Sequence, residues 1–370
     1  MPRRERNKFV KKNQVLELTI EDYAFGGKGI ARIHSEEGSF VVFVPNTLPG
    51  QFVKVQIKKS SKKYAEAKLI DVLKPSEDEI KVPFQDIPGA PYIQLPIDLQ
   101  HQYKKESTLS LFKRIGKVAN IEDLFDEFIT SPNVFHYRNK MEYSFSTLIS
   151  EMGTGEESEG FALGFKRRGQ WWAVENLEAD SGLFDAQFEG AMLQIRQHCE
   201  QTNLPPWNPA KSNGFFRFLV VRKSYVHDEL LFNLVTTSKD IDQFDKMAFV
   251  DLLKGILGEE RLAGVIHTIN DEVGDVAKQP AEQSTLLYGK RKIVENILGL
   301  DFEISMQSFF QTNPKCAEQL YSKVIEYVRA GMESSATTNG VAMDLFCGTG
   351  TIAQLLANDP NIDKVIGVDI

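Results

Sequence analysis

A glycine-rich segment near the C-terminal end constrains the fold of this chain more than any other feature. The apolar run 340–346 (GVAMDLF) leads into 347–353 (CGTGTIA), and a second apolar run ends at Asp369. This order predicts a strand, a turn, a helix and a second strand, the start of a doubly wound α/β sheet. Such a turn lets a ligand approach the backbone and the N–H groups of the helix. We therefore expect a nucleotide site in which Asp369 accepts hydrogen bonds from ribose hydroxyls.

Two kinds of cofactor fit this segment. Gly348, Gly350 and Ala353 match a dinucleotide fingerprint, and Asp369 follows at the required distance of about 20 residues. Asp344, however, lies inside the first strand, where a carboxylate suits a ligand with an ammonium group, such as S-adenosylmethionine (SAM). The residues favour SAM, and the alternatives are a dinucleotide or a purely structural glycine turn.

Charge is distributed unevenly along the chain. The net charge is −8, yet residues 1–70 contain 14 Lys and Arg against 7 Asp and Glu, and the remaining residues contain 29 against 44. A basic module on an acidic body is typical of a nucleic-acid-binding appendage. A solvated, lysine-rich surface is the alternative reading.

Residues 14–73 read as five short strands separated by turns. This pattern predicts a small all-β barrel of the OB type, which binds nucleic acid through a basic face with aromatic side chains. The candidate contacts are Lys28, Arg32, Lys62, Lys63 and Tyr64, together with Phe25, Lys58 and Lys59. For Phe25 and Tyr64 the alternative is a place in the core.

The rest of the chain predicts a mixture of helices and strands. Residues 96–125 favour a helix with Asp98 as N-cap and one broad apolar face, and residues 314–331 favour another. Strands are expected at 143–146, 161–165, 216–221 and 230–236, and an acidic loop at 151–160. The predicted organisation is a barrel (1–73), a proline-rich linker (74–95), a central α+β domain (96–285) and an α/β domain (286–370). The helix at 96–125 is placed in the central domain or against the α/β domain.

Several classes of protein are excluded by composition. No run of about 18 apolar residues occurs, so we expect no membrane-spanning helix. The basic N-terminus lacks the apolar segment of a secretory signal. Three cysteines, Cys199, Cys316 and Cys347, argue against a disulfide framework and favour the cytoplasm.

Two motifs give the chain a family resemblance. Residues 344–350 (DLFCGTG) and 308–313 (SFFQTN) together resemble the RNA uracil-5-methyltransferase family of the RumA/TrmA type, which includes 23S rRNA 5-methyluridine methyltransferases. Residues 14–73 look like the RNA-binding TRAM domain of that family, and its central domain is resembled by 137–145, 217–222 and 287–289. The resemblance implies that the last domain begins a class I SAM methyltransferase sheet.

The resemblance also implies roles for matching residues. The SAM site would comprise Gln311, Phe346, Thr351 and Asp369, with Asp344, Gly348 and Gly350 of the turn. Arg138, Asn139 and Lys140 would lie near RNA or brace the active site. The implied reaction is methylation of uracil C5 in RNA through a cysteine adduct at C6, with a glutamate removing the C5 proton.

Two departures from the family pattern bear on these roles. Some members bind an iron–sulfur cluster through linker cysteines, but the corresponding positions here are Val82, Pro88 and Pro91, so we expect no cluster. The chain also ends at Ile370, before the family's nucleophilic cysteine and its glutamate base. We expect a truncated, inactive chain that holds no catalytic residue and uses none of its three cysteines as nucleophile.

The leading interpretation is a monomeric, cytoplasmic, SAM-dependent RNA methyltransferase. Ribosomal RNA is the favoured substrate and transfer RNA the alternative one. The alternatives in function are a non-catalytic RNA-binding fragment and a SAM-dependent RNA methyltransferase of another specificity. An NAD-linked oxidoreductase has less support, because nothing upstream supplies a hydride-transfer site.

Overall fold

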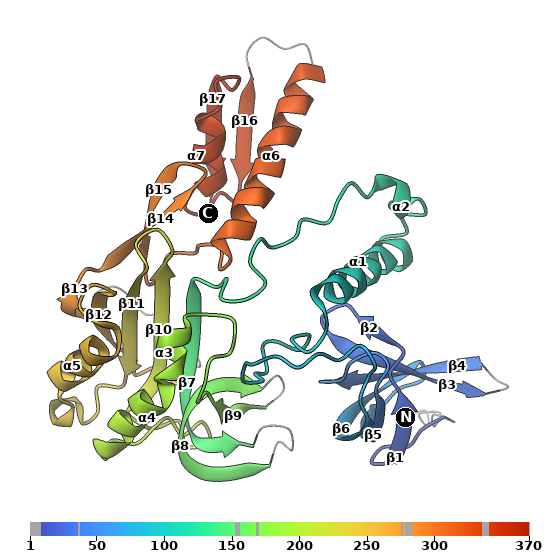
Figure 1. Ribbon diagram of the computed structural model, residues 1–370, viewed down its shortest axis with the longest axis horizontal. Helices are drawn as coiled ribbons and strands as arrows, with labels where there is room; N and C mark the ends of the chain where they lie inside the picture. Colours follow the sequence, from blue (N-terminus) through green and yellow to red (C-terminus); the bar gives the residue numbers. More distant parts are fainter. Residues whose placement is uncertain are drawn as a thin grey trace, which may run out of the picture. The chain divides into compact units, whose positions relative to one another are not determined.

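The computed structural model describes residues 9–35, 38–151, 156–167, 170–274, 277, 283–334 and 340–369. The chain divides into two units, Met1–Phe128 and Ile129–Ile370 (Figure 1). No helix among the described residues combines the length and the apolar character needed to span a membrane.

The first unit is built on a six-stranded sheet. Its strands are β1 (Val15–Thr19), β2 (Asp22–Ala24), β3 (Lys28–Ser35), β4 (Gly38–Pro45), β5 (Phe52–Ser60) and β6 (Tyr64–Lys74). Their order is β1-β5-β6-β4-β3-β2, and only the β4–β6 pair is parallel. Because side chains alternate along a strand, Val42, Val44, Val53 and Val55 face a shared core. The all-β module is confirmed, with the short β2 as an additional strand.

The linker and the first helix pack on this sheet. Leu95 of the linker and Tyr103 of α1 (Ile97–Arg114) share an apolar cluster with Tyr23 of β2. The rings of Tyr23 and Tyr103 lie edge to face, 5.4 Å apart. This contact places α1 in the first unit, whereas the sequence placed it in the central domain or against the α/β domain.

The helix predicted at 96–125 differs from the observed structure in three respects. It is interrupted after Arg114 and resumes as the short α2 (Ile121–Leu124), with Lys117 between them at a positive φ of 59°. Pro96 occupies the N-cap position in place of Asp98, without a side-chain cap. The predicted apolar face is covered only in part, since Tyr103 packs on Tyr23 whereas Phe112 and Ile115 are exposed. The periodicity was correct for a helix, but the C-terminal part of that face lacks a covering element among the described residues.

The second unit contains a seven-stranded sheet. Its strands are β7 (Lys140–Ser150), β8 (Glu157–Arg167), β9 (Gln170–Asn176), β10 (Phe216–Ser224), β11 (Glu229–Thr236), β12 (Leu262–Ile269) and β13 (Ser284–Gly289), in the order β13-β12-β11-β10-β7-β8-β9. The four predicted strands lie within β7, β8, β10 and β11. Of the predicted acidic loop, residues 157–160 belong to β8 and residues 152–155 lie outside the described part.

Both faces of this sheet are covered. One face packs against α3 (Ala186–Gly190), α4 (Met192–Gln201) and α5 (Lys246–Leu257), with Phe188 of α3 against Phe232 of β11. A short 3-10 helix (Ile241–Gln243) precedes α5. The hairpin of β14 (Lys292–Ile297) and β15 (Leu300–Ser305) covers the other face. Every residue of β11 is therefore buried.

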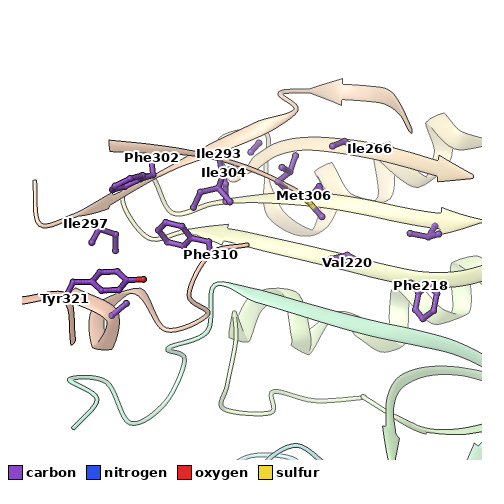
Figure 2. Packing of buried hydrophobic residues seen from close by; sticks show 14 of the residues in the cluster. Phe218, Val220, Ile266, Ile293, Ile297, Phe302, Ile304, Met306, Phe310 and Tyr321 are labelled. Atoms are coloured by element: carbon purple, nitrogen blue, oxygen red, sulfur yellow. The ribbon is translucent and has the colours of Figure 1, made fainter. Parts of the chain in front are cut away.

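The hairpin leads into a segment that joins the same core. Figure 2 shows Phe310 with Phe302 of the hairpin and Tyr321 of α6 (Pro314–Ser334) at one end of the apolar cluster. The rings of Phe302 and Phe310 are 6.2 Å apart. The helix predicted at 314–331 is thereby confirmed and fixed to the central sheet.

The predicted strand–turn–helix–strand order ends the chain. The last elements are β16 (Val341–Leu345), α7 (Thr351–Ala357) and β17 (Lys364–Val368). The two strands pair in parallel, and α7 connects them. Residues of α6 and α7 cover the face that contains Ala342 and Val365. On the opposite face Val341, Met343 and Leu345 are 57%, 59% and 60% exposed.

Candidate functional site

The turn between β16 and α7 is shaped by residues with positive φ. Phe346, Gly348 and Gly350 have φ of 63°, 55° and 75°. A Cβ added at Gly348 would meet no atom within 4 Å, so its glycine is required by backbone conformation and not by crowding. The space above this residue is open to a ligand.

Asp344 joins the end of β16 to the start of α7. Its Oδ2 accepts a hydrogen bond from the Ala353 N–H at 2.9 Å. A carboxylate at the N-terminus of a helix is stabilised by the helix dipole as well as by this bond. Asp344 therefore has a structural role that the sequence did not predict, beside the ligand role that it did.

The remaining turn residues differ in accessibility. Phe346 is 81% exposed, whereas Thr351 is 8% exposed and its hydroxyl lies 3.3 Å from that of Thr349. Asp369 follows β17, and its Oδ2 accepts the Gly348 N–H at 2.5 Å. The structure thus brings Asp369 to the glycine turn, as predicted, and leaves Phe346 with far more contact surface than Thr351.

Gln311 lies in the segment before α6 and is exposed, whereas Tyr321 of α6 is buried. Burial raises the pKa of Tyr321, the Gln311 side chain lowers it and the Asp344 carboxylate raises it. Tyr321 is therefore near both motifs of the predicted cofactor site.

The three residues 138–140 have different environments. Arg138 and Lys140 are partly exposed, whereas Asn139 is only 2% exposed. The Asn139 Nδ2 donates to the Gln311 carbonyl at 3.1 Å. Burial of Asn139 is consistent with the predicted bracing role, and RNA contact by Arg138 and Lys140 stays a prediction.

Three predicted RNA contacts of the first unit, Lys28, Arg32 and Tyr64, share one outer face. Arg32 of β3 pairs with Val41 of β4, which pairs with Tyr64 of β6. Lys28 lies further along β3 and is 3.9 Å from Glu66, and Arg32 is 2.6 Å from Glu21. Lys62 and Lys63 form the turn that leads into Tyr64.

The two aromatic candidates of this unit are outside its core. Phe25 is 64% exposed. Tyr64 is partly buried, with its ring 5.7 Å from that of Phe43 and 6.0 Å from the Lys59 Nζ. A basic surface with accessible aromatic rings is consistent with binding of single-stranded nucleic acid.

Two of the three cysteines, Cys199 and Cys316, have a raised pKa. Burial raises the pKa of Cys199 in α4 and of Cys316 in α6. A reactive cysteine needs a lowered pKa, because the thiolate attacks. Cys347 lies in the glycine turn between β16 and α7, with its Sγ beside Gly367.

Three residues of this region were not predicted as site residues. The pKa of Tyr321 is influenced by Gln311 and Asp344, the buried Arg222 donates to carbonyls of the segment before α6, and Phe309 in that segment is 75% exposed. The sequence offers a signal only for Phe309, because adjacent residues of an extended segment point to opposite sides and one of the two rings at 309 and 310 should then face outward.

Comparisons with known proteins agree with this geometry. A TRAM domain model matches residues 10–70. An uncharacterized RNA methyltransferase of Clostridium tetani is 35% identical over 368 residues, which cover 98% of this chain and 74% of that protein. Another, from Caldanaerobacter subterraneus, is 34% identical over 362 residues and covers 97% of this chain and 74% of its own length.

A solved structure shares the fold. The crystal structure of Pyrococcus abyssi tRNA (uracil-54, C5)-methyltransferase in complex with S-adenosyl-L-homocysteine aligns with a TM-score of 0.64 and 20% identity, over 96% of this chain and 73% of that one. The N-terminal TRAM barrel and the α/β class predicted from sequence are thereby confirmed. With relatives of this similarity along nearly its whole length, the chain belongs to the RNA methyltransferase family.

Proposed function

We propose that this protein takes part in SAM-dependent methylation of uracil C5 in RNA. The observation that carries the proposal is the placement of two carboxylates at the open glycine turn, where Asp344 accepts from the Ala353 N–H and Asp369 accepts from the Gly348 N–H. These carboxylates can accept hydrogen bonds from the ammonium group and the ribose hydroxyls of a nucleoside amino acid. The family supplies RNA as the substrate class.

The residues present fit SAM. Asp344 would attract the ammonium group, Asp369 would accept from the ribose hydroxyls, and Phe346 offers an exposed ring to the adenine. Gln311 would contact the cofactor from the segment before α6, with Thr351 and the glycines lining the turn. SAM, when bound, supplies an electrophilic methyl group on sulfur.

The chemistry at uracil follows from the weak nucleophilicity of C5. Addition of a thiolate to C6 makes C5 enolate-like, so that C5 can accept the methyl group. A carboxylate then removes the C5 proton, and the thiolate leaves C6. The target base must be single-stranded or flipped out to be reached. We assign neither the thiolate nor the base to a residue of this chain.

The RNA would be held by the barrel and by the second unit. Lys28, Arg32, Lys62, Lys63 and Tyr64 lie on the first, and Arg138 and Lys140 on the second. We favour ribosomal RNA as substrate, with transfer RNA as the alternative, and a cytoplasmic monomer that holds no iron–sulfur cluster. The exposed Phe309 adds a ring on which a base can stack.

The cofactor half of the proposal is tested by calorimetry on residues 1–370. SAM should bind with millimolar or lower dissociation constant and NAD should not, and Asp369→Ala should weaken SAM by about tenfold or more, as loss of charge-assisted hydrogen bonds does. Absence of SAM binding would leave only an RNA-binding role.

The reaction is tested with the product of the whole reading frame of the gene. RNA carrying tritium at uracil C5 should release tritium to water in step with methyl transfer from SAM, for ribosomal or for transfer RNA. Methyl transfer without tritium release would instead indicate a methyltransferase that acts on another atom.

A further inference from the structure

The segment 306–312 carries Gln311 but contains no helix or strand of its own. It leaves β15 at Ser305 and enters α6 at Pro314. Phe310 is 8% exposed and Phe309 is 75% exposed, so the segment has one inward and one outward side. Its conformation therefore depends on the groups that form hydrogen bonds with its backbone.

Arg222 of β10 forms hydrogen bonds with the backbone of the first half of this segment. The side chain is 2% exposed. Its Nε donates to the Met306 carbonyl at 3.4 Å, and its Nη2 donates to the Ser308 carbonyl. A guanidinium has its donors in a fixed fork, so two carbonyls bound to it are held at a set spacing.

Asn139 forms hydrogen bonds with the backbone of the second half of segment 306–312. Its Nδ2 donates to the Gln311 carbonyl at 3.1 Å, and its backbone N–H donates to the Thr312 carbonyl at 2.8 Å. Its own carbonyl accepts from the Lys223 N–H at 2.9 Å, next to Arg222. Arg222 and Asn139 therefore bind the segment from adjoining positions of the central sheet.

Neither side chain is well suited to the core for stability alone. The Asn139 Oδ1 and the Arg222 Nη1 are buried and have no hydrogen-bond partner among the described residues. Burial of an unpaired polar atom is unfavourable. What these residues add is the attachment of segment 306–312.

We propose that Asn139 and Arg222 are positioning residues that hold Gln311 at the cofactor site. The proposal rests on the proposed function, because it takes Gln311 as a SAM contact. Neither residue touches the cofactor; each acts through the backbone on which Gln311 is carried.

The chain offers matched controls. Arg217 is a second buried arginine of β10, 1% exposed, but its guanidinium donates to the carbonyls of Asn270 and Gly274 at 2.9 Å and 2.6 Å. Asn233 of β11 is a second buried asparagine, and its Oδ1 accepts from Thr268 at 2.7 Å. Like the proposed pair, both control residues are buried, and they bind other segments.

The experiment measures two properties of residues 1–370. Arg222→Lys and Asn139→Ala are compared with Arg217→Lys and Asn233→Ala, and Gln311→Ala marks the loss of the contact itself. Calorimetry gives the SAM dissociation constant, and amide hydrogen exchange of the 306–313 peptide reports the attachment. Thermal unfolding records the loss of stability in each variant.

We expect Arg222→Lys and Asn139→Ala to raise the SAM dissociation constant about tenfold, approaching Gln311→Ala, and to speed exchange in 306–313. The control variants should lose similar stability with less than a twofold change in affinity. Equal losses of affinity in controls and test variants, or faster exchange with unchanged affinity, would overturn the proposal. Lack of SAM binding by the unmodified chain would overturn the proposed function itself.

If Asn139→Ala fails to fold, Arg222→Lys alone decides, because it keeps the charge and one donor group in the same place. A full loss of affinity in Gln311→Ala with none in a folded Arg222→Lys would show that Gln311 needs no such support.

Discussion

The central sheet and the β16–β17 pair differ in how many faces they bury. In β11 every side chain is buried, because α3–α5 cover one face and the β14–β15 hairpin covers the other. In β16 only the face toward α6 and α7 is covered, and Val341, Met343 and Leu345 are exposed. Stability of the second unit should therefore reside in the central sheet, while the glycine turn between β16 and α7 is supported by a thinner layer.

The largest effect should follow a cavity in the central sheet. Phe232→Ala removes a fully buried ring that packs against Phe188, and we expect the free energy of unfolding to fall by about 3–5 kcal/mol. Urea unfolding followed by circular dichroism measures it. A loss below about 1 kcal/mol would show that the central sheet is not the stable part.

The second effect depends on pH. Burial lowers the pKa of His267 in β12 to about 4, and its Nε2 lies 2.8 Å from the Thr236 hydroxyl. The unfolded chain binds the proton near pH 6.5 and the folded chain only near pH 4, so stability is lost as the pH falls between these values, by about 2–3 kcal/mol.

Urea unfolding at a series of pH values tests this dependence. His267→Gln, which cannot titrate, should flatten the profile between pH 6.5 and 4. An unchanged slope in this variant would assign the acid sensitivity to other groups.

The third effect separates the two roles of Asp344 at the thinner region. Asp344→Asn keeps an oxygen that can accept the Ala353 N–H but removes the charge. We expect about tenfold weaker SAM binding, with unfolding free energy lowered by less than about 1 kcal/mol. Calorimetry and urea unfolding measure the two quantities. Asp344→Ala, which removes the acceptor as well, should lose more stability; equal stability of the two variants would contradict the structural role.

The smallest effect should come from the exposed face of β16. Met343→Ser changes a side chain that is 59% exposed, so the free energy of unfolding should change by no more than about 0.5 kcal/mol. The same urea measurement checks it against Phe232→Ala. A loss above about 1 kcal/mol would mean that this face is covered in solution and would remove the contrast between the two regions.

Local pattern was sufficient for much of the architecture. Strand alternation identified the barrel, and the glycine turn with its two acids identified β16, α7 and β17. The apolar spacing of Ala317, Tyr321 and Ile325 identified α6. These features depend on neighbours in sequence, and period and turn chemistry encode them directly.

Features that depend on distant contacts were not accessible. Asn139 is adjacent in sequence to two basic residues and was grouped with them, yet its partner is the carbonyl of Gln311. The sequence placed Tyr321 on the apolar face of a helix, but the influence of Gln311 on its pKa depends on the course of the chain before α6. The exposed face of α1 shows the converse, since amphipathic spacing says nothing about whether a partner is present.

The hydrogen bonds from Arg222 and Asn139 to segment 306–312 also restrict which mutations the gene can tolerate. Arg222 binds the carbonyl of Ser308 and Asn139 binds that of Gln311. Between these points the chain alternates, with Phe309 outward and Phe310 inward. Insertion or deletion of one codon here would turn the outward ring inward and the inward ring outward, and would shift Gln311 away from its hydrogen bond to Asn139. Many substitutions at Phe309, in contrast, would leave the hydrogen bonds from Arg222 and Asn139 intact. Evolution of this segment should therefore proceed by substitution of residues, with the length of the segment unchanged.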